Sequence, residues 1–427
     1  MQFIYKNISG VEELEINKSR KLLSQYIDQC KKGVRERNYE MDEASLCLVD
    51  DQNMVNTVKN LVEKKKTSKL KYIINIGIGG PNLGTKAIYD ALYGTVDCFQ
   101  QNRYPKVIFL DTTDPEYTFQ FIHFFDTLQL NPAEVLVNIG SKSGGTTETA
   151  VNGEIAIHLL KEKFNKWEER CVVITEKNSR LWDNATKMGI DVLENPKKVG
   201  GRYSVFCPIG LFPLALCGIQ IEKILHGATV MRDKCLNIDE QNSALISAAI
   251  LYEHLKKGIA INDNFYFHSE LESLGKWYRQ LMGESTGKNG MGLTPTVSMG
   301  SVDLHSMVQL YLGGPKNKYT SFVYTNSYKE CNLPIPNILT HIKEIEGKSV
   351  GHIMMAIQQG TMMAYKKLNL PYTETLLDYI NETELGAYMQ FKMNEMMFLG
   401  KLMGVNTFDQ PQVELYKTET KKILANK

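Results

Sequence analysis

A loop rich in hydroxyl groups carries the most telling chemistry of the sequence. It reads Ser-Lys-Ser-Gly-Gly-Thr-Thr-Glu-Thr over residues 141–149, and it follows the apolar run 135–139. A helix-like segment comes next, so the loop would deliver hydroxyls, one ammonium and backbone N–H groups to a helix N-terminus. Glycine lets a backbone approach a ligand closely, and lysine adds a point charge suited to phosphate. The loop therefore predicts a phosphate site, with a Ser/Thr-rich turn that merely caps the helix as the alternative.

A second glycine-rich segment, residues 77–84, ends another apolar run. It does not fit a dinucleotide-binding fingerprint, because Asn82 stands where glycine is required. It does not fit a nucleoside triphosphate loop either, because Thr85 separates Gly84 from Lys86. A tight strand-to-helix turn and a ligand contact both remain open for this segment.

Four further segments carry residues whose chemistry is not explained by packing alone. Arg202 follows a flexible glycine pair, where its planar fork can meet an oxyanion, although most arginines are simply solvated. Glu284 stands where an amphipathic helix runs out, and a carboxylate there is either a surface residue or an available base. His305 lies at the start of a predicted helix and is either a turn or core residue or a proton carrier. Lys417 ends the fourth segment, and by default a lysine there is expected to lie in solvent.

Strand and helix patterns alternate along the chain and indicate the elements that position these residues. Near-continuous apolar runs predict strands at 71–78, 106–110, 135–139 and 171–175, with helices such as 82–92 and 147–164 between them. Such runs suit a parallel sheet covered on both faces. The pattern restarts after about residue 240, with strands at 265–268 and 320–324 and helices at 270–282, 303–312 and 349–368.

This alternation predicts an α/β protein with two αβα sandwiches that are joined through residues 200–220. The opening segment 11–34 and the closing stretch from residue 376 are expected to be helical and to wrap the second sandwich. Ligands of open parallel sheets bind at the carboxyl ends of strands near the switch point, which is where the loop at Ser141 would lie.

Composition limits the classes of function. The chain has 427 residues, of which 43% are hydrophobic, and its formal net charge is +1, so no global field attracts nucleic acid or an anionic membrane. The eight cysteines show neither Cys-x-x-Cys pairs nor zinc spacing, which favours free thiols in a reducing compartment and no structural metal. The N-terminus lacks the apolar core of a secretory signal, and no apolar segment reaches membrane-spanning length. A cytoplasmic location is expected.

The segments, taken together and in this order, resemble the signatures of the glucose-6-phosphate isomerase family. The resemblance extends from about residue 70 to the C-terminus and is similar to the compact bacterial form; its motifs are those at residues 77–80, 141–143, 200–204, 283–288, 303–306 and 408–417. It implies two sugar isomerase (SIS) domains with parallel sheets, flanked by helical extensions. The implied division is a helical segment 1–45, a first SIS domain 46–200, a connecting segment 201–240, a second SIS domain 241–400 and a tail 401–427 that carries Lys417.

The resemblance also implies a role for each matched residue. Glu284 matches the base that moves a proton between carbons 1 and 2 of the open-chain sugar through a cis-enediolate, and Arg202 matches the cation that stabilises the developing negative oxygen. His305 matches the residue that opens the sugar ring, supplied in this family by the neighbouring subunit of a homodimer, and Lys417 matches a second ring-opening group. The remaining matches are substrate contacts: Ser141, Lys142, Ser143 and Thr146 on the phosphate, and Gly79, Gly80, Gln280 and Gln410 around the sugar.

The implied reaction is the isomerisation of glucose 6-phosphate and fructose 6-phosphate, a step of glycolysis and gluconeogenesis. It moves a proton rather than a hydride, so no cofactor and no metal are expected, and the only small-molecule partner is a sugar phosphate. Pro81, Gly145 and Gln412 depart from the family pattern, and the first two remove hydroxyls from the sugar and phosphate sites. These departures leave open an altered substrate range, such as mannose 6-phosphate, and a non-catalytic regulator that binds sugar phosphates.

Overall fold

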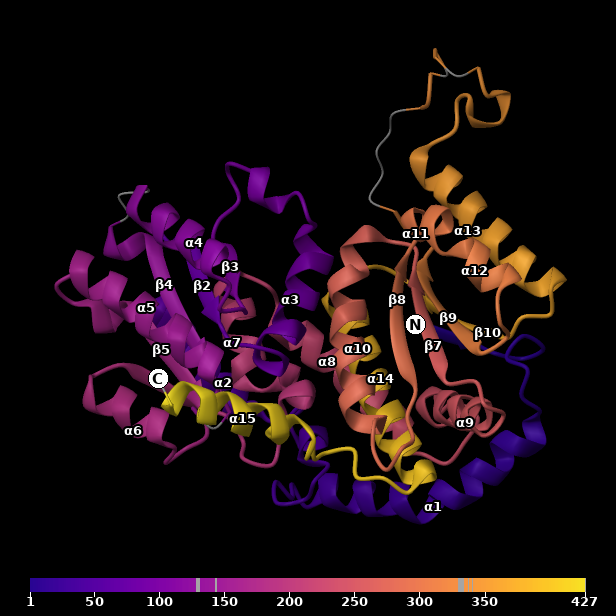
Figure 1. The fold of residues 1–427 in the computed structure, drawn as a ribbon, viewed down its shortest axis with the longest axis horizontal. Coiled ribbons are helices and arrows are strands. Elements are labelled where there is room, and N and C mark those ends of the chain that lie inside the picture. The colour runs from indigo at the N-terminus through magenta and orange to yellow at the C-terminus, as the bar shows by residue number, and fades with distance from the viewer. Residues whose placement is uncertain (128–130, 143, 329–333, 337, 340, 427) are drawn as a thin grey trace.

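The chain folds into two αβα sandwiches that lie next to each other, each built on its own sheet (Figure 1). The computed structural model describes residues 1–127, 131–142, 144–328, 334–336, 338–339 and 341–426. Within these residues, parallel pairing dominates both sheets, and helices lie at both ends of the chain. The predicted α/β fold class, with two parallel sheets and helical extensions, is therefore confirmed.

The first sheet has the strand order β3-β2-β4-β5-β6, and all of its described pairings are parallel. Its strands are β2 (Tyr72–Ile76), β3 (Lys106–Leu110), β4 (Val135–Gly140), β5 (Cys171–Thr175) and β6 (Asp191–Glu194). Its helices are α2 (Gln52–Lys65), α3 (Gly80–Tyr93), α4 (Pro115–Thr127), α5 (Thr147–Lys163) and α6 (Arg180–Lys187). Ile73 and Ile74 of β2 belong to different core clusters, so the sheet is covered on both faces, as its apolar runs predicted.

The second sheet has the order β1-β10-β9-β7-β8, in which only the edge strand β1 is antiparallel among the described pairings. Its strands are β1 (Gln2–Ile4), β7 (Ile261–Tyr266), β8 (Thr294–Met299), β9 (Lys318–Thr325) and β10 (Tyr372–Leu377). The helices of this half are α9 (Ser243–Lys256), α10 (Glu272–Thr286), α13 (Val350–Lys367) and α14 (Glu382–Met403).

The predicted strand at 265–268 is wrong in its bounds, because β7 already begins at Ile261 and ends before His268. Polar residues hid the start of this strand. Asn262, Asp263 and Asn264 are fully buried, and each has a hydrogen-bond partner on a neighbouring strand; the Asn262 side chain, for example, donates to the Ser321 hydroxyl at 3.1 Å. Among the described residues, Asp263 Oδ2 and Asn264 Oδ1 have no partner. Buried polar groups with hydrogen-bond partners break the apolar pattern of a central strand without breaking the strand.

The predicted helix 303–312 is two short helices, α11 (Val302–Ser306) and α12 (Val308–Gly313). Met307 between them has a φ of −120°, outside the helical region. Beyond the break, the Tyr311 hydroxyl lies 2.8 Å from the Ser298 hydroxyl and donates to Asp263 at 3.1 Å. These side-chain bonds fix α12 on the sheet, which a continuous helical pattern does not reveal.

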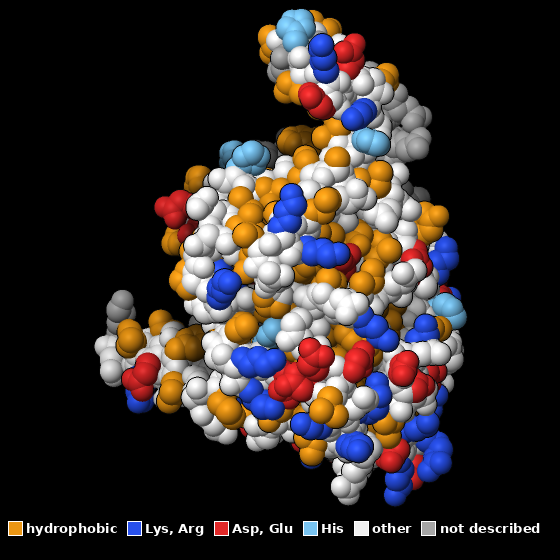
Figure 2. All heavy atoms as spheres, turned by 90° about the vertical axis from the view of Figure 1, so that its right-hand side faces the viewer, with side chains coloured by type: hydrophobic (Ala, Val, Ile, Leu, Met, Phe, Trp, Pro, Cys, Tyr) orange, Lys and Arg blue, Asp and Glu red, His pale blue; other side chains and the backbone are white. Residues whose placement is uncertain are grey.

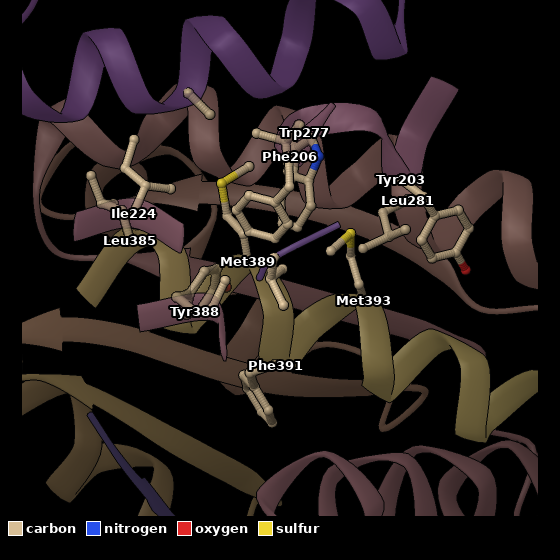
Figure 3. Packing of buried hydrophobic residues seen from close by; sticks show 14 of the residues in the cluster. Tyr203, Phe206, Ile224, Trp277, Leu281, Leu385, Tyr388, Met389, Phe391 and Met393 are labelled. Atoms are coloured by element: carbon tan, nitrogen blue, oxygen red, sulfur yellow. The ribbon is translucent and has the colours of Figure 1, made fainter. Parts of the chain in front are cut away.

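The segment between the sandwiches is buried and helical. The 3₁₀ helix η5 (Gly201–Phe206) leads into α7 (Pro208–Leu216) and α8 (Ile221–Cys235), which packs against α14. Figure 3 shows Trp277 and Leu281 of α10 close to Phe206 and to Met389 and Met393 of α14. This packing holds α10 at the junction of the two halves.

The terminal helices differ in where they lie. Helix α1 (Glu13–Arg35) packs against α9 and α14, so it wraps the second sandwich as predicted. The closing stretch agrees with the prediction only over α14, which is buried along most of its length. The last helix, α15 (Val413–Ala425), has no buried residue, and Figure 1 shows it directed toward the side of the first sandwich. Of the helices described, none is long and apolar enough to cross a membrane.

Candidate active site

The predicted phosphate loop connects β4 to α5 at the carboxyl end of the first sheet. Ser141 is buried, its backbone N–H donates to Ile174 at 3.1 Å, and its hydroxyl accepts from the Gly144 N–H at 3.1 Å. Gly144 has a φ of +70°, a conformation that favours glycine. Thr146 stands at the N-cap of α5, and within the described residues its side chain makes no capping bond. The first turn of α5 therefore keeps N–H groups for an anion. Ser143 lies outside the described residues.

Lys142 places a positive charge beside this helix start. It is half-buried, and no ion pair is formed by its ammonium with the residues that are described. Burial lowers the pKa of the Lys142 ammonium, and the nearby Arg202 charge lowers it further against the opposing effect of Glu176. The Lys142 ammonium, which has no ion pair among the described residues, and the free helix N-terminus beside it favour an anionic ligand.

Two glycines allow the start of α3 to lie directly against the segment that carries Arg202. A Cβ atom on Gly80 would stand 1.9 Å from the carbonyl carbon of Gly201, so no larger residue fits without moving the backbone. Gly79 has a φ of +64°, and a Cβ atom there would stand 2.8 Å from the Gln280 amide nitrogen. The glycine-rich segment 77–84 thus serves as a tight turn that also borders the side chains of the candidate site.

Arg202 is the centre of a dense set of hydrogen bonds, although its side chain is only 1% exposed. One terminal nitrogen donates to the Glu284 carboxylate at 3.1 Å and to the Gln410 amide oxygen at 2.8 Å. Nε donates to the Ser285 hydroxyl at 3.0 Å. The other terminal nitrogen donates to the backbone carbonyls of Thr407 and, at 3.0 Å, Asp409. The fork geometry of a guanidinium is needed to satisfy so many acceptors at once.

Glu284 lies in the last turn of α10 with both carboxylate oxygens engaged. Gln280, one turn earlier on the same helix, donates its amide N–H to Oε1 at 2.9 Å, while Arg202 binds Oε2. The side chain keeps 27% of its exposure, so the carboxylate is held in a fixed direction and is still accessible to a small molecule. A fixed, accessible carboxylate next to a buried cation suits proton abstraction with stabilisation of the resulting negative oxygen.

Comparison with known proteins identifies the family to which the chain belongs. Residues 41–306 match the phosphoglucose isomerase family over more than half of the chain. The chain belongs to this family. The glucose-6-phosphate isomerase of Methanocaldococcus jannaschii is 35% identical over 373 residues, which cover 86% of each protein.

Two solved structures share the fold of this family member. A hypothetical protein of Thermus thermophilus is 27% identical, with a TM-score of 0.86 over 99% of both chains. A glucose-6-phosphate isomerase of Chlamydia trachomatis has a TM-score of 0.81 over 98% of this chain and 87% of its own, at 19% identity. The second likeness extends the fold to a distant sequence.

The structure does not bring all residues of the resemblance together. Arg202, Gln280, Glu284 and Gln410 are joined by direct hydrogen bonds. His305 is exposed on α11 of the second sandwich. Lys417 lies on α15 and forms a 2.9 Å ion pair with Glu414, and within the described part of the chain it contacts neither Arg202 nor Glu284.

Three hydrogen-bond partners of Arg202 were not predicted from the sequence. Ser285 binds the guanidinium, and its position directly after Glu284 was a usable signal. Thr407 and Asp409 contribute backbone carbonyls, which no side-chain pattern reports. Over the described ranges, no group of three or more His, Cys, Asp and Glu side chains is placed to hold a metal ion.

Proposed function

We propose that this phosphoglucose isomerase family member interconverts glucose 6-phosphate and fructose 6-phosphate, with Glu284 as the base and Arg202 as the stabilising cation. The supporting observation is the placement of the Glu284 carboxylate between the Gln280 amide and the buried Arg202 guanidinium, 3.1 Å from the latter. Three segments that are far apart in the sequence meet there, namely those that carry Arg202, the pair Gln280 and Glu284, and Gln410, and packing alone does not require this.

The proposed reaction moves one proton between neighbouring carbons. Glu284 removes the proton from carbon 2 of the open-chain aldose, and the electron pair moves toward the carbonyl oxygen on carbon 1 to give an enediolate. Arg202 faces the carboxylate and can stabilise the negative oxygen, a contribution of several kcal/mol in a site that excludes water. Return of the proton to carbon 1, with passage of the hydroxyl proton from oxygen 2 to oxygen 1, gives the ketose. Atoms and charges balance without a redox partner.

The loop at Ser141 is the proposed anchor for the phosphate. Ser141, Lys142, Ser143, Thr146 and the start of α5 would bind it, because the Lys142 ammonium has no ionic partner among the described residues and the helix start offers free N–H groups. Binding energy from this remote group orients the reacting carbons over Glu284. Gly79, Gly80, Gln280 and Gln410 line the sugar side of the same pocket in this proposal.

We also propose a homodimer in which His305 serves the site of the partner subunit. His305 is exposed on a helix pair that exposes 71% of Val302 and 46% of Leu310, and α13 next to it exposes 52% of Val350 and 61% of Met363. Figure 2 shows that hydrophobic side chains are spread between lysines on this side of the second sandwich. A homodimer interface on this face would cover these exposed apolar side chains. Lys417 lies on α15, which has no buried residue, and would be the second ring-opening group beside His305.

The proposed division of the chain is the one that the resemblance implies, with SIS domains at 46–200 and 241–400, a connecting segment at 201–240 and terminal segments at 1–45 and 401–427. The sheets support the two domain ranges, since β2 to β6 fall within the first domain and β7 to β10 within the second. The segment 1–45 is not entirely helical, because its strand β1 pairs with β10 at the edge of the second sheet. A cytoplasmic location is proposed as well. It rests on the described cysteines, all of which are free thiols, the state that a reducing compartment maintains.

The decisive variant for the base is Glu284→Gln. We expect kcat on fructose 6-phosphate to fall by about 10²- to 10⁴-fold, the usual contribution of a general base, while affinity for sorbitol 6-phosphate stays within about twofold. Sorbitol 6-phosphate keeps the phosphate but has no carbonyl, so it reports binding alone. Glu272→Gln, at the opposite end of α10, is the matched control and should behave as wild type. An unchanged kcat in Glu284→Gln would remove Glu284 from the mechanism.

Subunit sharing has its own test. Glu284→Gln and His305→Ala proteins, each inactive, are mixed under conditions in which subunits exchange. A mixed dimer holds one site with an intact Glu284 and an intact partner His305, so part of the activity should return. No recovery despite proven exchange would place His305 outside the shared site.

A further inference from the structure

Lys288 lies just beyond the end of α10 and connects two parts of the candidate site. Its ammonium donates to the backbone carbonyls of Glu284, at 3.1 Å, and Ser285, at 3.3 Å, which belong to the last turn of α10. It also donates to the carbonyl of Asn406 and forms a 3.2 Å ion pair with the Asp409 carboxylate. One cation therefore binds the helix that carries Glu284 and the loop that carries Gln410.

The second partner of Lys288 is the loop 406–410, which reaches the site from the far end of the chain. This loop supplies three acceptors to Arg202: the carbonyls of Thr407 and Asp409 and the Gln410 amide oxygen. In the described part of the chain, the loop joins α14 to α15, and no residue of α15 is buried. The loop is therefore held by its hydrogen bonds to Arg202 and Lys288 together with the Phe408 ring, whose centroid lies 5.4 Å from that of Tyr203.

Burial makes this arrangement costly for a lysine. Only 7% of the Lys288 side chain is exposed, and a buried ammonium gives up its hydration. Burial is the main cause that lowers the pKa of Lys288, and the Arg202 charge lowers it further, while Asp409 and Glu284 oppose both effects. A flexible, buried cation next to a second cation is a poor choice for stability alone, which points to a role in arranging the site.

We propose that Lys288 is a positioning residue that ties the loop 406–410 to the end of α10 and so sets Glu284 and Gln410 at their correct places around Arg202. It does not need to touch the sugar. The inference rests on the proposed function, since it names a residue that orients the proposed base. The alternative is a purely structural cap for the C-terminus of α10, which would change stability without selectively changing kcat.

The test compares Lys288→Met with wild type and with Lys276→Met. Lys276 lies on α10 and forms an exposed pair with Glu272 at 2.8 Å. Three quantities are measured: the midpoint of thermal unfolding, kcat on fructose 6-phosphate, and the Kd of sorbitol 6-phosphate. For Lys288→Met we expect kcat to fall by about 10- to 100-fold, the effect of a displacement near 1 Å, with Kd within about twofold because the phosphate loop is elsewhere. Lys276→Met should match wild type. A Lys288→Met enzyme with kcat within twofold of wild type, or with kcat and Kd impaired in parallel, would overturn the inference.

Asp409→Ala gives an independent variant that is not expected to unfold the protein, because 52% of the Asp409 side chain is exposed. It removes the ion pair and leaves the backbone carbonyls, so kcat should fall by about 3- to 10-fold with Kd unchanged. The double variant should match Lys288→Met alone, since both changes act through one contact. Additive losses would contradict the inference. Should Lys288→Met fail to fold, Asp409→Ala decides, because an unchanged kcat there overturns the inference.

A result that refutes the isomerase activity can be distinguished from one that refutes the role of Lys288. Wild type that binds sorbitol 6-phosphate but does not turn over fructose 6-phosphate would refute the isomerase assignment. Amide hydrogen exchange over residues 405–412 would still test the link made by Lys288, since Lys288→Met should speed exchange there by at least tenfold in any case. Unchanged exchange would overturn the inference independently of catalysis.

Discussion

Replacing Arg202 by methionine removes the group on which the candidate site is centred. Methionine keeps most of the stem, so the change mainly deletes the guanidinium and its bonds to Glu284, Ser285, Gln410 and the carbonyls of Thr407 and Asp409. Two consequences follow, one for folding and one for catalysis, and they can be measured separately.

The folding cost can be worked out from burial. Breaking a buried ion pair costs about 3–5 kcal/mol, but Glu284 keeps 27% exposure and can regain water, which lowers that figure. Thr407 is 3% exposed, so its carbonyl is left without a donor at a cost of about 1–3 kcal/mol. We expect the free energy of unfolding in urea to fall by about 3 kcal/mol in total, which a domain of ordinary stability survives.

The same substitution should also lower kcat. Removing a fixed donor aimed at a developing oxyanion costs about 10²- to 10³-fold in kcat. Arg202→Lys restores a charge but not the fork, so it should recover only part of this loss. Stopped assays of glucose 6-phosphate formation from fructose 6-phosphate, run beside urea titrations of the same preparations, separate the two effects. A folded Arg202→Met enzyme with kcat within tenfold of wild type would refute the reasoning.

Three further outcomes are expected. Burial lowers the pKa of Lys142 below the ordinary lysine value of about 10.4, and only the protonated form attracts phosphate. The affinity for sorbitol 6-phosphate should therefore weaken as pH rises through the lowered pKa. Calorimetric titrations measure this loss, which Lys142→Arg should abolish. Burial lowers the pKa of His254 to about 4, so between pH 6.5 and 4 the unfolded chain binds a proton that the folded chain does not. The free energy of unfolding should therefore fall by about 3 kcal/mol as pH drops from 6.5 toward 4. Urea titrations at several pH values measure this fall, and a His254→Gln variant whose unfolding free energy falls equally with pH would contradict the prediction. Gly80→Ala should destabilise the fold by about 1–3 kcal/mol and lower kcat at least tenfold because its Cβ would meet Gly201, whereas Gly360→Ala, with open space in a helix, should not lower either quantity.

The first sandwich was largely predictable because its strands are buried on both faces. Apolar runs at 106–110 and 171–175 coincide with β3 and β5, and the run at 135–139 misses only the last residue of β4. Short apolar runs rich in β-branched residues, such as Val-Ile-Phe in β3 and Val-Val-Ile-Thr in β5, favour central parallel strands. The short strand β6, with a charged residue at each end, has no such run and was not predicted.

The second sandwich was less predictable because its core contains polar groups. The first half of β7 contains Asn262, Asp263 and Asn264, whose burial is made possible by partners on β8 and β9 that only the fold brings near. Beyond the break at Met307, Tyr311 of α12 likewise bonds to Asp263 of β7. Local pattern cannot report interactions that are set by tertiary contact.

In the candidate site, too, the charged side chains were predictable and the contacts made by the fold were not. Arg202 and Glu284 stood out in the sequence as charges next to glycines, and the structure places them 3.1 Å apart. The bonds from Arg202 to carbonyls of the loop 406–410, and from Lys288 to the Glu284 carbonyl, were not predictable, because a backbone acceptor carries no residue signature. Pro81, which departs from the family pattern, occupies the first turn of α3, where proline is tolerated, so this departure does not disturb the helix.

The most direct test of the central claim is proton NMR of the wild-type protein with fructose 6-phosphate in deuterated water, without added metal or nicotinamide. Proton transfer through an enediolate at Glu284 predicts that glucose 6-phosphate appears with deuterium at carbon 2, because the base exchanges its proton with solvent during turnover. Bound sugar phosphate with neither product nor exchange at carbon would contradict the claim.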